Sequence, residues 1–533
     1  MILNVSNTPS RLNRLRSFPL AGILIFPVIA IFLLSSCSGS GKVKEGRGLY
    51  LSSKGSDDNP GTFAKPWLSL DRLGRESLEP GDRVYLEGGT RFKGTLVLDS
   101  VDSGSDGNYI LITSYGNGKA IVDGSVHEAA RISGCQYFTI RNINFKGDGR
   151  SAGSKADGVV LSNCNDFVVD SIDVSGFQHS GVLVDGSRNA RLTSVIAHDN
   201  GFSGILVSGP HANDPVIYDN TGLYIGYCVA YNNPGDPTVK ENHSGNGILA
   251  CSVNGGTIEY CEAYNNGWDM VWTGNGPVGI WIWDCNDFTI QYCISHDNKT
   301  NPVAADGGGF DLDGGVSNSV IQYCISYNNM GPGYGLFEFG AAKPWKNNLI
   351  RYNISRNDGL KNGGAVSVWR GNNGGVISDC EIHNNTFYTD TPRGISVWLD
   401  KDLEGFRFSN NIFCYSGSFI GKDQKIRITR FVNNCFFDLS GRNNYGPVKG
   451  TASERSLFVN PAFTEARWVN PVLPWDKAKT GLESLVPRTV SPVIDRSDST
   501  GILYGFKPLS KDIIGNAIPN GKAIDLGAIE LIR

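Results

Sequence analysis

The 533-residue sequence lacks the signatures of several common classes of protein. It has 12 cysteines but no C-x-x-C pair, which argues against a structural zinc site. Its lysines and arginines form no basic stripe and the formal net charge is −4, so we expect no nucleic-acid partner. The repeated central part shows no helical periodicity. Glycine, with 67 residues, has about twice its average share, as turn-dense β-proteins require.

One short phrase recurs along the middle of the chain. It reads Asp-Phe-Thr-Ile-Gln-Tyr-Cys-Ile-Ser-His-Asp-Asn at 287–298, and close copies lie at 319–329 and 348–357. Each copy follows a glycine that opens a β-rich run, and many of these glycines lie roughly 23–32 residues apart. Such units cannot bury a core alone and must stack on one another. The repeat therefore predicts an all-β solenoid, a parallel β-helix.

Cysteine recurs at one place in the phrase. The residues at this place are Cys228, Cys261, Cys293, Cys324 and Cys380, with Asn353 in a copy that lacks cysteine. A small residue at the same place in each coil predicts an inward stack at a bend. Neighbouring parallel strands lie about 4.8 Å apart, and nothing in this arrangement requires disulfides.

The N-terminus has the features of a secretory signal. Three arginines precede an apolar run at 20–34, which ends in Leu-Ser-Ser-Cys at 34–37. This pattern predicts a signal peptide over 1–36. The last four residues resemble the bacterial lipobox, which implies lipidation of Cys37. An uncleaved N-terminal anchor is the alternative.

The lipobox resemblance also implies a location. We expect a protein anchored by its lipid to the outer membrane of a bacterial cell envelope, with the surface and periplasmic faces both open. Residues 37–48 would form a flexible tether. Cleavage would remove the three arginines of the signal peptide and lower the net charge from −4 to −7.

The rest of the chain divides into a cap, a run of coils and a closing segment. We expect an N-terminal cap over 49–80 with a short helix near 65–73, because an exposed solenoid end invites edge pairing. Coils are predicted over 81–440. Residues 441–533 are predicted to hold the C-terminal coils and an irregular closing cap.

Several phrases resemble those of secreted bacterial β-helix proteins of the pectate-lyase-like superfamily. They are Gly-Asp-Arg-Val-Tyr-Leu-Glu-Gly-Gly at 81–89, Ile-Val-Asp-Gly at 121–124, Ser-Pro-Val-Ile-Asp at 491–495 and Ala-Ile-Asp-Leu-Gly-Ala-Ile-Glu at 523–530. The resemblance implies a right-handed parallel β-helix and a carbohydrate-active protein. It does not select an activity, since this fold hosts lyases, hydrolases, epimerases and non-catalytic adhesins.

Aromatic and acidic residues gather at predicted outward positions of neighbouring coils. Alternate strand residues face outward, so the second and fourth residues after each opening glycine should form columns. Between 279 and 340 the second-residue column holds Trp281, Asp311 and Phe337, and the fourth-residue column holds Trp283, Asp313 and Phe339. Sugar rings stack on exposed aromatics, and glycosidic cleavage needs paired carboxylates. We therefore place a candidate substrate-binding face here.

The segment Asp-Gly-Gly-Gly-Phe-Asp-Leu-Asp-Gly-Gly at 306–315 is the strongest single motif. Asp311 and Asp313 should leave one strand on the same side, and their repulsion would separate their pKa values into an acid and a base. Asp306 is a third candidate catalytic carboxylate. The pair could instead bind Ca²⁺, or all three could be solvated turn aspartates. The motif faintly resembles segments of polygalacturonases, although their full set, which includes Gly-His-Gly, is absent.

Glu338 is a further catalytic candidate. Strict alternation places it inside, where an unpaired carboxylate is costly, whereas a bulge would bring it out beside Asp313. We favour the outward position. Other candidate sugar contacts are Trp268, Trp272, His243 and Arg370, each with a plain structural role as the alternative.

Three functions stay open. The favoured one is a glycoside hydrolase that uses Asp306, Asp311, Asp313 and Glu338 and needs no cofactor. The second is a polysaccharide lyase acting on a uronate-containing glycan, with Asp311 and Asp313 holding Ca²⁺. The third is a non-catalytic glycan-binding adhesin. A lyase for acidic sugars should show a basic cleft, which these columns lack, so we favour the hydrolase. We expect a monomer that meets a polysaccharide or oligosaccharide.

Overall fold

The computed structural model describes the chain from residue 46 to 533 with eleven short gaps. The described residues are 46–153, 155–209, 217–340, 343–371, 375–400, 403–421, 428–443, 445, 448–449, 455–497, 501 and 503–533. The predicted signal peptide and Cys37 lie outside the described residues. In these ranges, no helix has both the length and the apolar character to cross a membrane.

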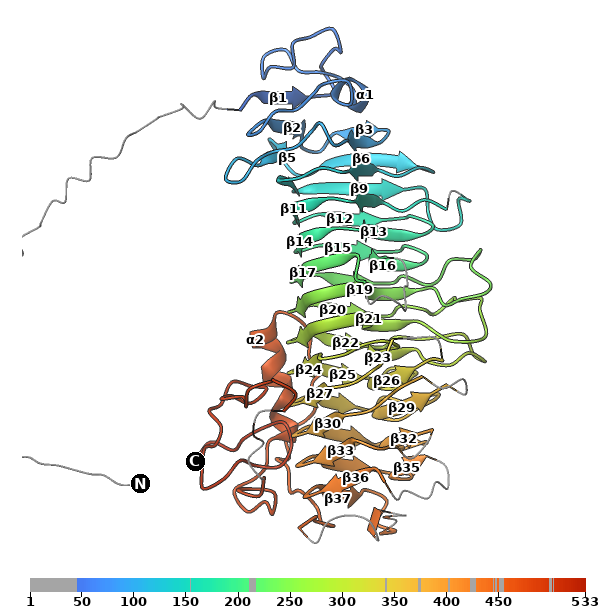
Figure 1. The fold of residues 1–533 in the computed structure, drawn as a ribbon, viewed down its shortest axis with the longest axis vertical. Coiled ribbons are helices and arrows are strands. Elements are labelled where there is room, and N and C mark those ends of the chain that lie inside the picture. Colours follow the sequence, from blue (N-terminus) through green and yellow to red (C-terminus); the bar gives the residue numbers. More distant parts are fainter. Residues whose placement is uncertain are drawn as a thin grey trace, which may run out of the picture. The chain divides into compact units, whose positions relative to one another are not determined.

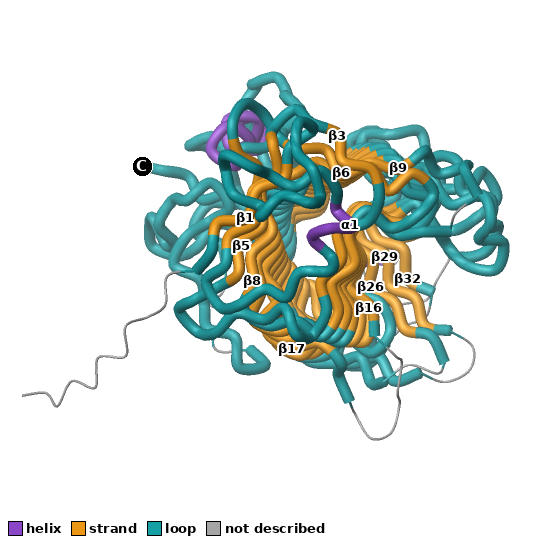
Figure 2. Tube along the Cα trace, turned by 90° about the horizontal axis from the view of Figure 1, so that it is seen from above, coloured by secondary structure: helices purple, strands orange, loops and turns teal. Residues whose placement is uncertain are grey.

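The predicted parallel β-helix is confirmed. Strands of successive coils stack in parallel register into one 24-stranded and one 13-stranded sheet (Figure 1). Viewed along the stack, the strands of successive coils superimpose (Figure 2). A continuous cluster of buried apolar side chains forms the core of the coils. The larger sheet covers two faces of the coil. They are joined because β19 (Asn246–Glu259) and β21 (Val278–Gln291) each run through the bend between them without interruption.

The three faces contain the following strands. The 13-stranded sheet consists of β3 (Arg91–Lys93), β6 (Ala120–Ser125), β9 (Ile143–Gly147), β12 (Asp173–Ser175), β15 (Ile196–His198), β18 (Val229–Tyr231), β20 (Glu262–Tyr264), β22 (Ile294–His296), β25 (Ile325–Tyr327), β28 (Ile354–Arg356), β31 (Thr386–Thr389), β34 (Ile412–Tyr415) and β37 (Cys435–Asp438). A second face consists of β1 (Gly48–Leu51), β2 (Arg83–Glu87), β5 (Ile110–Tyr115), β8 (Phe138–Arg141), β11 (Asn165–Asp170), β14 (Arg188–Thr193), β17 (Asn220–Gly226), β24 (Val320–Gln322), β27 (Asn348–Arg351), β30 (Cys380–His383), β33 (Phe406–Ser409) and β36 (Arg430–Val432). The third face consists of β4 (Leu96–Leu98), β7 (Ala130–Ser133), β10 (Val159–Ser162), β13 (Ser180–Asp185), β16 (Ser203–Ser208), β23 (Gly308–Leu312), β26 (Tyr334–Glu338), β29 (Val366–Arg370), β32 (Val397–Leu399) and β35 (Ile420–Gly421).

Two ladders of small polar residues hold the bends. Cys228, Cys261, Cys293 and Cys324 are fully buried and stack as predicted, and the described cysteines are all free. Cys380 is a correction. It pairs with Asn348, and Asn385 occupies the place below Asn353 instead. Cys380 therefore does not belong to the cysteine stack.

The second ladder consists of buried amides that bond from coil to coil. Its members are Asn200, Asn233, Asn266, Asn298 and Asn329, and it ends on Asp358. Each side chain accepts from the amide above while satisfying buried backbone groups, which a solenoid bend must do to avoid unpaired polar atoms.

The ends of the solenoid are covered differently. At the N-terminal end, α1 (Leu70–Leu73) is a single turn that the Ser69 side chain caps, and its two leucines join the core. After the last strand, the chain returns along the outside of the coils. This returning segment contains α2 (Trp475–Ala478) and the 3₁₀ helix η2 (Lys479–Leu485). Trp475 packs edge-on against Tyr292, and the segment covers the face that contains β22, β25 and β28 (Figure 1).

Candidate active site

A pocket of about 1030 Å³ lies on the third face, over β16 to β32. Its walls combine aromatic side chains with a few charged and polar groups. The aromatics are Phe202, Trp281, Trp283, Phe337, Phe339, Trp369 and Trp398, and the titratable groups are His179, His243, Cys251, Asp306, Asp313, Lys361 and Arg393. A concave aromatic surface with few polar groups is the usual form of a small-ligand site.

The outward columns predicted from the sequence match the strand register from Trp281 to Asp311. In the next coil the residues predicted for these columns are displaced by two positions. Trp281 pairs with Asp311, but Asp311 pairs with Gly335 rather than with Phe337. The opening glycine of that coil is thus Gly333, two residues earlier than we counted. Phe337 consequently follows Asp313 in its column and pairs with Trp369. The same two-residue displacement puts Trp398 in the column of Trp281, through Ser367.

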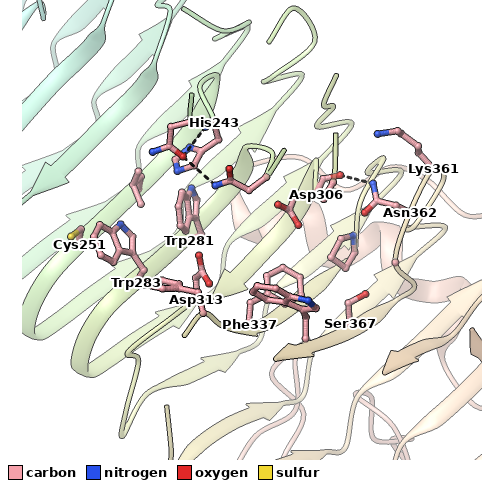
Figure 3. A pocket seen from close by; sticks show the side chains of 18 of the residues that line it. His243, Cys251, Trp281, Trp283, Asp306, Asp313, Phe337, Lys361, Asn362 and Ser367 are labelled. Carbon is pink, nitrogen blue, oxygen red and sulfur yellow. Dashed lines mark hydrogen bonds between the residues drawn. The ribbon is translucent and has the colours of Figure 1, made fainter. Parts of the chain in front are cut away.

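Asp306 and Asp313 line the pocket from opposite ends of β23. Burial raises the pKa of Asp306 to about 6, although the Gly276 N–H, 2.9 Å from Oδ2, and the charge of Lys361 oppose the rise. Burial and the charge of Asp306 raise the pKa of Asp313 to about 7, while a 2.7 Å hydrogen bond from the Gly314 N–H opposes it. Figure 3 shows both carboxylates in the space beside Trp281 and Phe337.

Asp311 is not in the pocket lining with them, but it interacts with both: burial and then the charges of Asp313 and Asp306 raise the pKa of Asp311 well above its ordinary value. Its side chain is 3 % exposed, lies outside the pocket lining, and leaves Oδ1 without a hydrogen bond. An added Cβ at Gly335 would come within 2.9 Å of Asp311 Oδ1 and 2.8 Å of the Phe337 ring. Because Gly335 has no side chain, it leaves room for the Asp311 carboxyl, and the Phe337 ring packs beside that carboxyl. β23 ends at Leu312, so Asp313 begins the following turn, where its Oδ1 accepts a hydrogen bond from the Gly314 N–H.

Glu338 faces the inside of the coil, so the outward position we favoured is wrong. β26 pairs continuously with β29 and contains no bulge, so Glu338 keeps the inward side shared by Tyr334 and Leu336. It is fully buried, and its Oε2 accepts a 3.1 Å hydrogen bond from the Gly315 N–H. Burial raises the pKa of Glu338 to about 8, which keeps the group neutral where a charge would be costly.

The remaining predicted sugar contacts are scattered. His243 lines the pocket. Trp268 lies on a separate surface hollow, where its ring is 5.8 Å from the Arg150 guanidinium. Trp272 is outside the lining and donates its indole N–H to Asn275 Oδ1 at 2.8 Å. Arg370 pairs with Glu338 in register and is also outside the pocket lining.

Several pocket residues were not predicted. The His179 ring lies 2.6 Å from Asp157 through Nδ1, and Lys361 donates to the carbonyl oxygens of Asn301 (2.8 Å) and Ala304. Asn362 donates to the backbone oxygen of Asp306 at 2.8 Å (Figure 3). His179, Lys361 and Asn362 come from connections between strands, where the repeat that predicted the columns carries no information.

The described residues contain no cluster of metal-binding side chains. Among them, no group of three or more His, Cys, Asp or Glu side chains is arranged to hold a metal ion. A Ca²⁺ held by Asp311 and Asp313 stays a prediction.

Comparison with known proteins supports the fold and places the chain in a family. The model of the Pel9A-like right-handed β-helix region matches residues 49–373. "Pectate lyase L" of Paenibacillus polymyxa is 25 % identical over 300 residues, which cover 54 % of this chain and 59 % of that protein. "Lacto-N-biosidase" of Bifidobacterium longum subsp. longum is 23 % identical over 469 residues, which cover 68 % of this chain and 28 % of that protein. The chain thus spans less than two thirds of the length of both curated relatives.

Solved structures with similar folds include pectate lyase Pel9A, with a TM-score of 0.45 and 16 % identity, over 92 % of this chain and 97 % of that one. The GH136 lacto-N-biosidase of Eubacterium ramulus has a TM-score of 0.41 and 20 % identity, over 64 % of each chain. Because the family model covers more than half of the sequence, and describes the right-handed coil that the strands build, the chain belongs to the family of Pel9A-like right-handed β-helix proteins.

Proposed function

We propose that this protein is a glycoside hydrolase whose catalytic carboxylates are Asp306 and Asp313. The observation that carries the proposal is that these two side chains line one aromatic pocket with pKa values raised to about 6 and about 7. Between these values one carboxyl is protonated and the other ionised, which is the state that glycosidic cleavage requires.

The pair supplies both halves of the reaction. The protonated carboxyl donates its proton to the glycosidic oxygen, so the bond from the anomeric carbon breaks and the leaving sugar departs as an alcohol. The ionised carboxylate either attacks the anomeric carbon or removes a proton from the water that does so. The hydrophobic faces of the sugar rings pack on the tryptophans and phenylalanines of the walls. The names of the curated relatives, a pectate lyase and a lacto-N-biosidase, agree with carbohydrate cleavage in general.

A polysaccharide lyase is the second candidate, favoured by one observation. Lys361 lines the same pocket and burial lowers its pKa, so a larger fraction of its amine is neutral and able to accept a proton than in an ordinary lysine. With Arg393 to neutralise a uronate carboxyl, Lys361 could take the proton beside that carboxyl, after which the glycosidic oxygen leaves and a double bond forms. Against this candidate, the Lys361 amine is already held by two backbone oxygens and faces the charge of Asp306.

Product analysis separates the candidates. The protein is incubated with neutral and uronate-containing polysaccharides, and new reducing ends are recorded beside the ultraviolet absorbance of unsaturated uronate. Reducing ends without that absorbance establish the hydrolase. Unsaturated products refute it in favour of the lyase, and their loss on chelation would assign Ca²⁺ to it. Glycan binding without any product would leave the adhesin.

We also infer that the mature protein is lipid-anchored at Cys37, from the lipobox-like sequence at 34–37. In a Gram-negative host fed labelled palmitate, the full-length chain should take up label and sediment with membranes. Cys37→Ser should do neither. A labelled Cys37→Ser protein would contradict the assignment.

A further inference from the structure

Two tryptophans of the pocket region fix the orientation of neighbouring amide side chains. The Trp281 indole N–H donates to Asn246 Oδ1 at 3.1 Å. An indole nitrogen only donates, so the atom that receives this bond must be the oxygen of the amide. The Asn246 amino group therefore points the other way, where it donates to the Phe202 carbonyl oxygen at 3.2 Å and to His243 Nδ1 at 3.1 Å.

This arrangement determines the tautomer of His243. Because Nδ1 accepts the bond from Asn246, the proton of the neutral ring is on Nε2. Burial lowers the pKa of His243 to about 4, so the ring stays neutral over the working range of pH. The ring lines the pocket, and Nε2 bonds to no residue in the described part of the chain. His243 is thus a permanent neutral donor at this wall.

A second relay orients Asn242. The Trp272 indole N–H donates to Asn275 Oδ1 at 2.8 Å, so the Asn275 amino group donates to Asn242 Oδ1 at 3.2 Å. The Asn242 oxygen also accepts from the His243 backbone N–H at 2.9 Å. The Asn242 amino group, with no partner among the described residues, is a second donor in the pocket lining.

His179 offers a hydrogen-bond acceptor, whereas His243 and Asn242 offer donors. Asp157 Oδ1 accepts from the Ser180 N–H at 2.8 Å and lies 2.6 Å from His179 Nδ1, so Nδ1 carries the proton. Nε2 of the neutral ring is then an acceptor, and no described residue bonds to it. Phe202 stacks on this ring at 4.5 Å and lies 5.9 Å from the His243 ring. An acceptor and a donor therefore flank one phenylalanine.

We propose that His179, Asn242, His243 and Phe202 form a subsite that binds a neutral sugar unit through adjacent hydroxyl groups. One hydroxyl donates to His179 Nε2, and its neighbour accepts from His243 Nε2 or the Asn242 amide, while the apolar side of the ring packs on Phe202. The sugar belongs to the substrate of the proposed hydrolase, on which the inference rests, but its binding requires no cleavage.

Charge around the subsite favours hydroxyls over a carboxylate. Above the pKa of His179 the ring is neutral, and a carboxylate, which only accepts hydrogen bonds, would face the lone pair of His179 Nε2 and the negative charges of Asp157 and Asp236. Burial alone would lower the pKa of His179. The hydrogen bond to Asp157 and the charges of Asp157 and Asp236 together have the larger effect, so the pKa of His179 lies above its ordinary value. The other titratable groups of the pocket are the neutral His243, the Cys251 thiol and, farther along, Asp306, Asp313, Lys361 and Arg393.

Binding is measured by calorimetry in the Asp313→Asn background, which prevents turnover. The ligands are xylobiose, cellobiose and lactose as neutral sugars, and digalacturonate as the acidic one. At least one neutral sugar should bind, and more tightly than digalacturonate. His243→Phe, which keeps the ring but removes the donor, should weaken that binding about tenfold. Trp268→Ala, on the separate hollow, is the matched control and should change nothing. Tighter binding of digalacturonate, unchanged affinity in His243→Phe, or no neutral sugar bound would each overturn the proposal.

A pH series tests whether His179 itself binds the sugar or only supports the pocket wall. Protonation of His179 turns its acceptor into a donor, so affinity for the neutral sugar should fall on the acid side. Asp157→Asn keeps an oxygen for the Ser180 and His179 N–H groups but removes the charge that raises the pKa of His179. The acid midpoint should therefore move to lower pH in this variant. A loss of affinity with no shift of the midpoint would contradict the role of His179. Because the readout is binding, failure of the hydrolase proposal in product analysis would leave these outcomes interpretable.

Discussion

Asp313 and Glu338 accept hydrogen bonds from consecutive backbone amides, those of Gly314 at 2.7 Å and Gly315 at 3.1 Å. One carboxyl lines the pocket and the other lies inside the coil. Burial first, and then the charge of Asp313, raise the pKa of Glu338 to about 8. Glu338 is therefore neutral near pH 7 and holds the turn that positions Asp313 without adding a second negative charge beneath it.

Asp306→Asn and Asp313→Asn should each lower kcat/KM for glycan cleavage by about 10²- to 10⁴-fold, the usual contribution of a general acid or base. Asp311→Asn is the comparison and should lose less activity, because this buried side chain lies outside the pocket lining and acts on the pair only through its charge. Initial rates of reducing-end formation test this, with thermal melting to show that all three proteins fold. A loss in Asp311→Asn as large as in the other two would refute the choice of the pair.

The pH–rate profile should be bell-shaped with its maximum between about 6 and 7, set by the pair that Asp306 and Asp313 form. The charge of Lys361 holds the pKa of Asp306 down. Lys361→Met should therefore move the acid limb of the profile to higher pH. Lys299→Met, which removes an amine bonded to Asn265 outside the pocket lining, should leave both limbs in place. An unmoved acid limb in Lys361→Met would argue against Asp306 as the group with the lower pKa.

Glu338→Gln should stabilise the protein increasingly as pH rises. The folded pKa of Glu338, about 8, lies above its ordinary value of 4.5, so unfolding releases a proton between these values and stability falls with rising pH. The slope of this penalty is at most about 1.4 kcal/mol per pH unit. Glutamine keeps the acceptor for the Gly315 N–H and has no such penalty. Urea unfolding at three pH values across this window should show the difference growing, whereas a constant difference would contradict the burial of a neutral carboxyl.

Trp369→Ala should raise KM about tenfold with a smaller effect on kcat, because the ring lines the pocket and offers a surface for a sugar. Trp268→Ala is the comparison, since its ring is 48 % exposed on a different hollow. Equal effects of the two substitutions would mean that the glycan extends beyond the pocket.

The periodic part of the sequence predicted the fold and the position of the site. Apolar residues at alternate positions and the recurring Tyr-Cys-Ile-Ser phrase can pack only if the coils stack, so the phrase copies at 287–298 and 319–329 by themselves imply parallel strands. The same counting placed Trp281, Trp283 and Asp313 on the pocket face. It went wrong at Phe337 because coils differ in length, and a glycine two residues away has the same parity as the true one.

What the sequence determined alone is the period, the strand faces and the presence of carboxylates and aromatics on neighbouring coils. Only the tertiary structure decided which carboxylates meet. Asp311 and Asp313 share parity, yet only Asp313, just beyond the end of β23, lines the pocket, and the unbroken pairing of β26 turns Glu338 inward. The tertiary structure also places His179 and Lys361 in the same pocket as Asp306. Both residues lie in connections between strands, where the sequence does not repeat. A repeat encodes contacts between equivalent positions, whereas the conformation of a loop depends on the particular groups it packs against.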